Sequence, residues 1–365
     1  MPKISSDTLW ELASAEVKSR ENGAGGEEDG GEDVRLSLSE RTVFFIGNKA
    51  GGKTTILLRC LDRDELPKPT LALEYTFGRR ARGHNTPKDI AHLWELGGGT
   101  SLSDLVQIPI TVQNVRSLSV VLVLDLSKPN TLWGTSERLL QASRTQVEKV
   151  CSQSQSTTES KALSKERVQN RPTRLLPKDH PDRELIDPFP VPLLVIGSKF
   201  DIFQDFDSEK RKVICKTLRF IAHYYAASLI FTSSKSESLV LKTKSVFTQL
   251  AFGTDKGKSM CLDPSKPLLV PMGMDSFSQI GSPPITDVEM GTLHAKNPLD
   301  LWKKVFEVVF PPESTSEHNI DVKDPAKDPQ YSEPQIDSMR AQKDMELEQY
   351  KRNASMSWKG LVLET

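Results

Sequence analysis

The sequence is poor in cysteine, almost neutral in charge and without long apolar runs, and each of these absences excludes a class of protein. Its four cysteines, among 365 residues, show no C-x-x-C pair and no other metal-type spacing, so we expect free thiols. The net charge of −1 gives no electrostatic case for binding nucleic acid or an acidic membrane. No apolar run is long enough to span a membrane, and no signal-peptide pattern begins the chain. We therefore expect a soluble, intracellular protein without membrane insertion.

Composition divides the chain into four segments. Apolar residues make up 37% of it and charged residues 27%, which suits a substantial core diluted by polar stretches. We predict a short helix (8–20) and an acidic, glycine-rich linker in 1–37, a main domain over 38–253 with a polar insertion at 151–190, an apolar segment over 254–312 and a polar, partly helical or disordered tail over 313–365.

One stretch matches a phosphate-binding motif. Residues 41–59 read RTVFFIGNKAGGKTTILLR, which is a strand-like run, a glycine-rich loop and a helical run. The loop fits G-x-x-x-x-G-K-[ST], and it stands between a strand and a helix as that motif requires. The residues predicted to bind phosphate are Gly47, Asn48, Lys49, Ala50, Gly51, Gly52, Lys53, Thr54 and Thr55. The alternative is a glycine-rich turn that matches by chance.

The residue types in this loop suit a nucleotide with Mg²⁺. Glycines let the backbone curl so that its N–H groups point at phosphate oxygens, and the following helix adds its positive N-terminal end. Lys53 would reach the β- and γ-phosphates, and the Thr54 hydroxyl would bind Mg²⁺.

The order of the remaining elements predicts the fold. Strand-like runs at 71–77, 90–96, 118–124, 193–196 and 228–231 alternate with helical patterns at 101–106, 129–150, 208–225 and 239–252. The run at 118–124, LSVVLVL, has no polar face, as expected of a strand covered on both sides. The alternation predicts an α/β fold, with a mostly parallel sheet and helices on both faces.

Two loops after the phosphate-binding motif would face Mg²⁺ and the γ-phosphate. Thr70 is the candidate for a second metal-binding hydroxyl, Thr76 is the alternative, and plain loop or strand threonines are an equal third reading. The next loop, at 95–98, reads ELGG where D-x-x-G is usual. Gly98 can still offer its N–H to a γ-phosphate, but Glu95 is a methylene longer than Asp and would displace the water-mediated contact to Mg²⁺. The next residue, Gly99, stands where a glutamine usually orients the attacking water, so we assign no catalytic residue.

Two further loops have the pattern of guanine recognition. The first, at 198–201, reads SKFD and follows a buried strand, where N-K-x-D is usual. Asp201 would accept hydrogen bonds from guanine N1 and N2, and the Lys199 stem would lie over the base. Ser198 lacks the amide with which Asn ties adjacent loops, so we expect weaker binding. The second loop, at 232–235, reads TSSK, and Ser233, Ser234 and Lys235 would approach guanine O6. Together these loops make residues 41–252 resemble a Ras-like GTPase domain.

The chain as a whole resembles the dynein light intermediate chain family, and within it the dynein 2 branch. The resemblance is carried by FFIGNKAGGKTTILLRCLDRDE, PKPTLALEYTFGRRARGHNTPKDIAHLWELGGG, DHPDRELIDPFPVPLLVIGSKFDIFQDF and KDPAKDPQYSEPQIDSM. It implies a non-catalytic subunit that binds the dynein 2 heavy chain and other dynein 2 subunits, and indirectly microtubules and intraflagellar transport trains. It further implies retrograde transport and cilium assembly, in the cytoplasm, cytoskeleton, axoneme, basal body and centrosome. Members of the family differ in whether they hold nucleotide, so GTP or GDP with Mg²⁺ and a nucleotide-free site are both open.

Two other functions compete with this reading. An active small GTPase switch is one, and Gly99 counts against it. A P-loop kinase of a small metabolite is the other, with Arg79, Arg80 and Arg82 as its lid, although a solvated loop explains these arginines better. The helical pattern at 298–310 favours a scaffold. Its apolar stripe is Leu301, Trp302, Val305, Phe306 and Val309, and we expect it to pack on the main domain.

Overall fold

The computed structural model describes residues 40–81, 88–156, 176, 180–253, 259–284, 297–312 and 333–362. The helix expected at 8–20, the acidic linker, Arg82 and much of the polar insertion lie outside the described residues. The chain divides into two compact units, Met1–Pro312 and Glu313–Thr365, and each is described by itself.

The first unit is built on a mixed sheet. Its strands are β1 (Glu40–Gly47), β2 (Leu73–Arg80), β3 (Asp89–Leu96), β4 (Leu118–Asp125), β5 (Leu193–Ser198), β6 (Ser228–Phe231) and β7 (Leu269–Val270). Within the described residues these form a seven-stranded sheet in the order β2-β3-β1-β4-β5-β6-β7. β2 is antiparallel to β3 and β7 is antiparallel to β6, while the remaining pairs are parallel. The predicted α/β, Ras-like architecture is confirmed.

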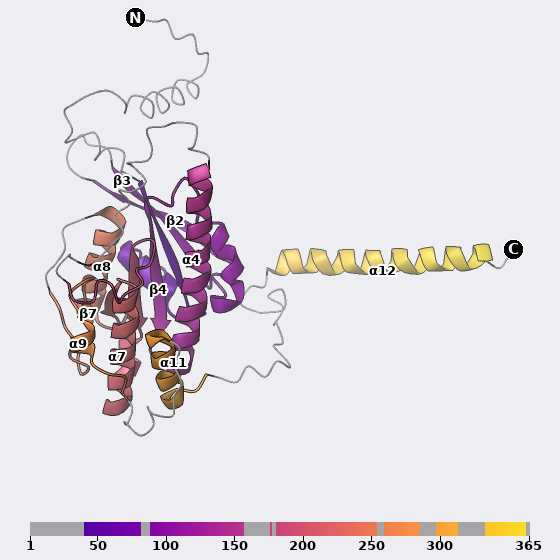
Figure 1. Cartoon of the computed structure of the whole chain (residues 1–365). Coiled ribbons are helices and arrows are strands. Elements are labelled where there is room, and N and C mark those ends of the chain that lie inside the picture. Colours follow the sequence, from indigo (N-terminus) through magenta and orange to yellow (C-terminus); the bar gives the residue numbers. More distant parts are fainter. Residues whose placement is uncertain are drawn as a thin grey trace, which may run out of the picture. The chain divides into compact units, whose positions relative to one another are not determined.

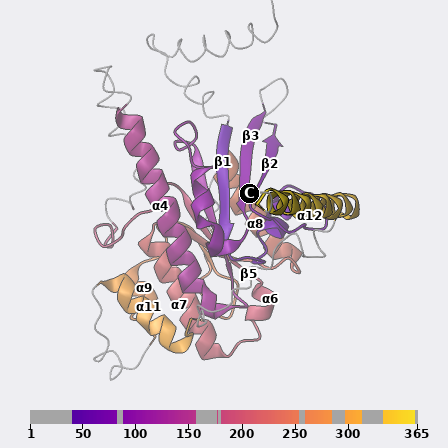
Figure 2. The same cartoon turned by 90° about the vertical axis from the view of Figure 1, so that its right-hand side faces the viewer.

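Helices cover both faces of the sheet (Figures 1 and 2). They are α3 (Lys53–Cys60), η1 (Gly99–Gln107), η2 (Pro129–Thr131), α4 (Leu132–Ser156), α6 (Phe200–Phe203), α7 (Ser208–Tyr224), α8 (Glu237–Phe252), α9 (Phe277–Ile280) and α11 (Pro298–Val309). Alternate residues of a strand point to opposite faces of the sheet. In β1, Phe44 therefore packs in the core under α4 and α7, and Phe45 packs in the core under α3 and α8. The central strand β4 is buried along its whole length, as its apolar run predicts.

Some boundaries differ from the sequence predictions. The helix expected at 101–106 is a 3₁₀ helix, η1, which begins at Gly99 directly after Gly98, and both glycines have positive φ. The long helix expected at 129–150 begins with the short η2 and then runs on to Ser156, so the start of the polar insertion is helical. The Pro- and Gly-broken run after 266, within the predicted apolar segment, adds the edge strand β7 and buries Leu268 and Ile280.

The segment after β7 is held against α7 by buried polar groups. The Arg219 guanidinium donates to both carboxylate oxygens of Asp275, at 2.8 and 2.7 Å. A buried ion pair of this bidentate kind is strongly directional, and removing one partner leaves the other charge uncompensated. The pair therefore fixes the position of the chain that leads into α9.

The amphipathic helix α11 lies against α7 and α4. Asn297 caps it, accepting from the Asp300 N–H, and its Trp302 ring stacks on Phe220 with 4.6 Å between centroids. Trp302, Val305 and Phe306 are buried, whereas Leu301 and Val309 are half-buried. Lys303 adds an ion pair of 2.7 Å to Glu137 of α4.

None of the four cysteines, all of which lie in the described part of the chain, forms a disulfide, as expected, and burial raises the pKa of Cys60 and of Cys215 to about 12. The second unit contains α12 (Pro334–Val362), a charged helix with ion pairs such as Lys343–Glu346. Among the described helices, none combines the length and the apolar character that crossing a bilayer requires.

Candidate functional site

The predicted phosphate loop connects β1 to α3, at the carboxyl ends of the parallel strands. Gly47 has φ +147° and packs so closely that a Cβ there would lie 2.0 Å from the Val123 carbonyl oxygen. Gly52 precedes α3 with φ +88°, and open space surrounds the position that its Cβ would take. Because Gly52 has no side chain, no side chain caps the first-turn N–H groups of α3. This is the geometry of an anion site at a helix N-terminus.

Lys53 is buried in this loop, with only 4% of its surface exposed. Its ammonium donates to the Asn48 carbonyl at 2.8 Å and approaches the Gly47 carbonyl at 3.4 Å. Burial lowers the pKa of Lys53, and the nearby Glu95 carboxylate opposes that shift. The side chain is thus held within the curl of the loop, where it would meet a bound phosphate.

The predicted metal ligands meet around Glu95. The Thr54 hydroxyl donates to Glu95 Oε1 at 2.8 Å, and Thr70 donates to Glu74 at 3.1 Å. Burial raises the pKa of Glu95, and the hydroxyls of Thr54 and Thr70 and the Lys53 ammonium oppose this. Two hydroxyls and a carboxylate are oxygen donors that suit Mg²⁺. The alternative candidate, Thr76, lies opposite Leu93 within the β2–β3 pairing instead.

The glycines after β3 leave no room for a water-orienting side chain. Gly98 and Gly99 have φ of +68° and +65°, a region that side-chain-bearing residues rarely adopt. A Cβ on Gly99 would lie 2.9 Å from the backbone nitrogen of Lys49 in the phosphate loop. The backbone conformation at position 99 therefore disfavours glutamine or any other residue with a side chain.

The two base loops meet around Asp201. Its carboxylate accepts from the Ser233 hydroxyl at 2.7 Å and pairs with the Lys235 ammonium at 2.8 Å. Partial burial alone would raise the pKa of Asp201, but the hydrogen bonds from Lys235 and Ser233 outweigh it and lower the pKa. The carboxylate is thus kept ionised, as guanine recognition requires. Ser234 and Lys235 are exposed at the rim.

Ser198 connects the base loop to the phosphate loop although it lacks the Asn amide, and the weaker binding expected from this substitution stays a prediction. Its hydroxyl lies 2.7 Å from the Gly51 carbonyl and 3.2 Å from the Leu124 carbonyl. The two loops are therefore connected without an Asn amide, because the Ser198 hydroxyl itself reaches the Gly51 carbonyl. Lys199, in the left-handed conformation, pairs with Asp125 at 2.6 Å.

The sequence analysis did not predict a second set of hydrogen bonds that holds the phosphate loop in place. The Asn48 side chain donates to the hydroxyls of Thr131 and Thr135, each at 2.9 Å, and accepts from the Asp125 N–H at 3.3 Å. Asn48 thus holds the loop against η2 and α4 through its side chain. Of the other predicted residues, Lys49 and Ala50 are exposed on the loop, and Thr55 is half-buried in the first turn of α3.

The predicted phosphate, metal and base residues lie around one edge of the sheet, with chemistry that suits a guanine nucleotide and no side chain at Gly99 to orient water. The uncapped α3 N-terminus and Lys53 fit the phosphates, Thr54, Thr70 and Glu95 fit Mg²⁺, and Asp201 fits the base. A bound Mg²⁺ would neutralise phosphate charge. Binding it through Thr54 requires the hydroxyl to release the Glu95 carboxylate that it now contacts.

A second group of possible metal ligands lies elsewhere in the fold. The ligand atoms of His180, Asp182 and His223 are within 4.8 Å of one another. Asp182 Oδ2 already accepts from His223 Nε2 at 2.8 Å and from the Phe277 N–H at 2.7 Å, and the Asp182 N–H lies 3.2 Å from His180 Nδ1. These hydrogen bonds satisfy the group without an ion, so we assign it a structural role.

Comparison with known proteins connects this site to a family. A family model described as dynein light intermediate chain matches residues 33–281. Proteins named cytoplasmic dynein 2 light intermediate chain 1 are 70% identical in Danio rerio, over 100% of both chains, and 62% identical in Homo sapiens, over 99% of both.

A solved structure agrees at the level of the fold. The crystal structure of the dynein light intermediate chain's conserved domain superposes with a TM-score of 0.51 at 16% identity, covering 74% of this chain and 97% of that one. From the match to the family model and the full-length relatives, the chain belongs to the dynein light intermediate chain family.

Proposed function

We propose that the protein is a non-catalytic subunit of the dynein 2 motor complex, which binds and stabilises the heavy chain for retrograde intraflagellar transport and cilium assembly. The observation that carries this is similarity over the whole chain to relatives named as dynein 2 light intermediate chains. The other dynein 2 subunits are further partners, and microtubules and transport trains are indirect ones. The protein would act on the cytoskeleton of the axoneme, basal body and centrosome.

The geometry around Gly99 supports a role without catalysis. Its positive φ and its closeness to Lys49 disfavour any side chain that would position water. Typical G-domains accelerate hydrolysis through such a side chain. We propose that GTP or GDP with Mg²⁺, when present, is a structural ligand, and that a nucleotide-free protein performs the same function.

An aromatic surface on β2 and β3 suits a protein partner. Tyr75 and Phe77 are 47% and 41% exposed, and the Tyr75 ring lies 5.1 Å from that of half-buried Trp94. We call Tyr75, Phe77 and Trp94 the aromatic face. Rings of this kind supply much of the binding energy at protein interfaces. We propose the aromatic face as a contact surface for the heavy chain.

Affinity purification of the tagged full-length protein from ciliated cells tests the proposed subunit role and the proposed aromatic face. We expect the dynein 2 heavy chain to co-purify with the unmodified protein, and much less of it with the double variant Tyr75→Ala, Phe77→Ala. Leu241→Ala, which removes a 58% exposed leucine from α8, is the matched control and should change nothing. Absence of the heavy chain from the unmodified sample would reject the proposed function, whereas an unaffected double variant would reject only the aromatic face.

A further inference from the structure

A cavity of about 300 Å³ lies between α8 and the amino-terminal ends of β5 and β6. It is far from the nucleotide loops, because Arg41 lines it at the start of β1 whereas Gly47 ends that strand. The two residues are six positions apart along the strand, which is roughly 20 Å at the usual rise. The cavity is therefore a separate feature of the domain.

The floor of the cavity is apolar. Leu194, Val246, Leu250 and Leu269 line it, and all four take part in the apolar core between the sheet and α8. These side chains come from β5, β7 and α8, so they form an apolar surface on the side of the sheet that carries α8. A floor of this kind favours the aliphatic part of a ligand.

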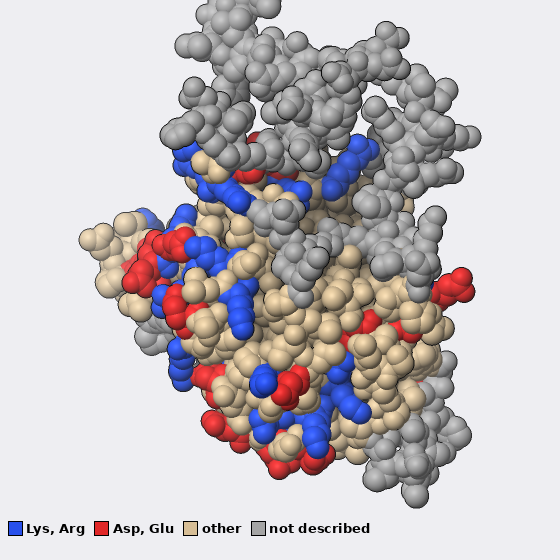
Figure 3. All heavy atoms as spheres, turned by 90° about the vertical axis from the view of Figure 1, so that its left-hand side faces the viewer, with Lys and Arg blue, Asp and Glu red and all other residues tan. Residues whose placement is uncertain are grey.

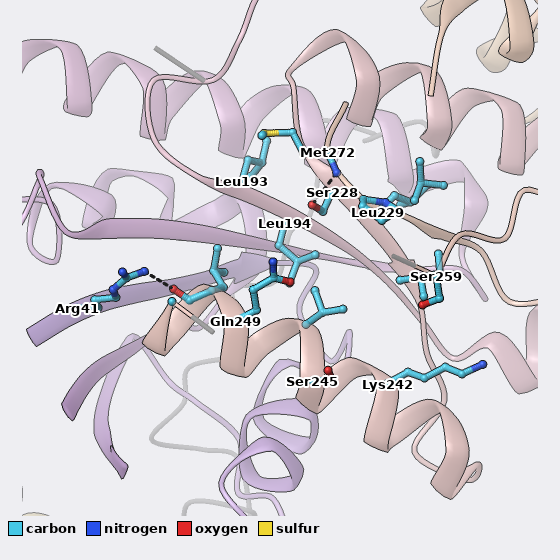
Figure 4. A pocket seen from close by; sticks show the side chains of 16 residues that line it. Arg41, Leu193, Leu194, Ser228, Leu229, Lys242, Ser245, Gln249, Ser259 and Met272 are labelled. Carbon is cyan, nitrogen blue, oxygen red and sulfur yellow. Dashed lines mark hydrogen bonds between the residues drawn. The ribbon is translucent and has the colours of Figure 1, made fainter. Parts of the chain in front are cut away.

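The rim of the cavity is polar and positively charged. Arg41 lies at one end and Lys242 at the other, with Gln249 between them (Figure 4). Arg41 is held at the α8 C-terminus, where its guanidinium approaches the Leu250 carbonyl at 3.4 Å. Within the described residues, no carboxylate lines the cavity and no ionic partner faces Lys242. The side of the molecule that carries α8 also shows a broad uncharged area in its middle (Figure 3).

We propose that this cavity binds a small amphipathic anion, with an aliphatic body and a terminal carboxylate. The body would lie on the leucine floor, and the carboxylate would be held at the cationic rim by charge-assisted hydrogen bonds. About 300 Å³ is the volume of roughly ten water molecules, which sets the scale of the ligand at on the order of ten non-hydrogen atoms. An aliphatic cation would meet the same floor but be repelled at the rim.

The competing occupant is a segment of the chain itself. Gly253 and Ser259 both line the cavity, and the five residues between them include Asp255. If this segment fills the cavity, an added anion would find no space, and replacing Asp255 would open the site.

Isothermal titration of the full-length protein with decanoate tests the proposal. We expect one decanoate per chain, with a dissociation constant on the order of 0.1 mM, ordinary for a ligand of this size. Lys242→Glu should weaken binding by at least about tenfold. Lys210→Glu, an exposed lysine of α7 on the other side of the sheet, should leave it unchanged. Decylamine should not bind saturably.

Three results would overturn the proposal. They are no saturable binding of decanoate, equal binding by the Lys242→Glu protein, and equal affinity for decylamine. Binding that appears only in an Asp255→Asn variant would assign the cavity to the chain's own segment. Thermal unfolding of each variant shows that the fold is intact, and both substituted lysines are exposed on helices, where such changes are usually tolerated.

Discussion

Gly99 illustrates how one residue limits the chemistry of the whole site. Its backbone conformation, with φ +65°, is one that glycine adopts freely and other residues adopt at a cost. Its neighbour across the loop, Lys49, comes from the phosphate loop itself. The two observations together predict that the protein hydrolyses bound GTP only slowly.

We expect the purified protein to hydrolyse GTP no faster than an unassisted small G protein, whose rate is on the order of 10⁻⁴ per second. The reason is that nothing at Gly99 can orient the attacking water. Phosphate release under multiple-turnover conditions measures this. Turnover on the order of one per second would contradict it.

Asp201 controls the choice of base. Replacing it by Asn should weaken guanine nucleotide binding by roughly 1–3 kcal/mol, because a charge-assisted pair of hydrogen bonds is lost. Calorimetric titration with GDP and with ADP measures both affinity and selectivity. Ser234→Ala, at an exposed neighbour, is the control. Equal GDP and ADP affinities in the unmodified protein would show that the assignment is wrong.

At the scale of elements, α11 is held to the first unit by a small number of large side chains. Trp302 is 5% exposed and stacks on Phe220, while Phe306 lies 6.2 Å from Trp133, measured between ring centroids. Burial of such rings contributes much of the free energy with which a helix packs.

Trp302→Ala should lower the free energy of unfolding by about 3–5 kcal/mol, as expected for removing a core aromatic. Val308→Ala, on the same helix and 59% exposed, should change it by less than about 0.5 kcal/mol. Urea unfolding of the full-length protein compares the two. Equal stability of the Trp302 variant and the unmodified protein would mean that α11 contributes little to the fold.

The contact of α7 with the segment before α9 should make stability depend on pH. Burial lowers the pKa of His223 below its ordinary 6.5, even though Asp182 and Asp275 face it, with His180 and Arg219 close by. The unfolded chain therefore binds this proton more readily than the folded one. Stability should fall as pH drops below about 6.5, until the lowered pKa is passed.

A His223→Gln variant should show a shallower loss of stability between pH 7.5 and about 5 than the unmodified protein, although it is less stable at pH 7.5. Urea midpoints at several pH values measure the slopes. His92→Gln, at a half-buried histidine of β3, is the control. Parallel slopes for the His223 variant and the unmodified protein would count against the assignment.

At the scale of the whole molecule, the first unit presents three separate surfaces. The nucleotide loops lie at the carboxyl ends of the parallel strands, the cavity at the amino ends of β5 and β6, and the aromatic face on β2 and β3. A ligand on one of them leaves the others accessible. This separation would allow the proposed heavy-chain partner and the proposed small anion to bind independently.

The sequence by itself determined the phosphate loop, the buried strand β4, the α/β alternation and the family. These features depend on local patterns: glycines at fixed spacing, apolar runs and strand-to-helix order, all of which are readable along the chain. The Ras-like fold class was predicted from the order of the nucleotide-type loops along the chain.

The tertiary structure alone decided how distant residues meet. Ser198 contacts Gly51 across 147 positions, and Arg219 contacts Asp275 across 56. The short strand β7 pairs antiparallel with β6 although its two residues carry no strand signal of their own. Such contacts depend on packing against the rest of the fold, and a short segment has no periodicity from which to read them.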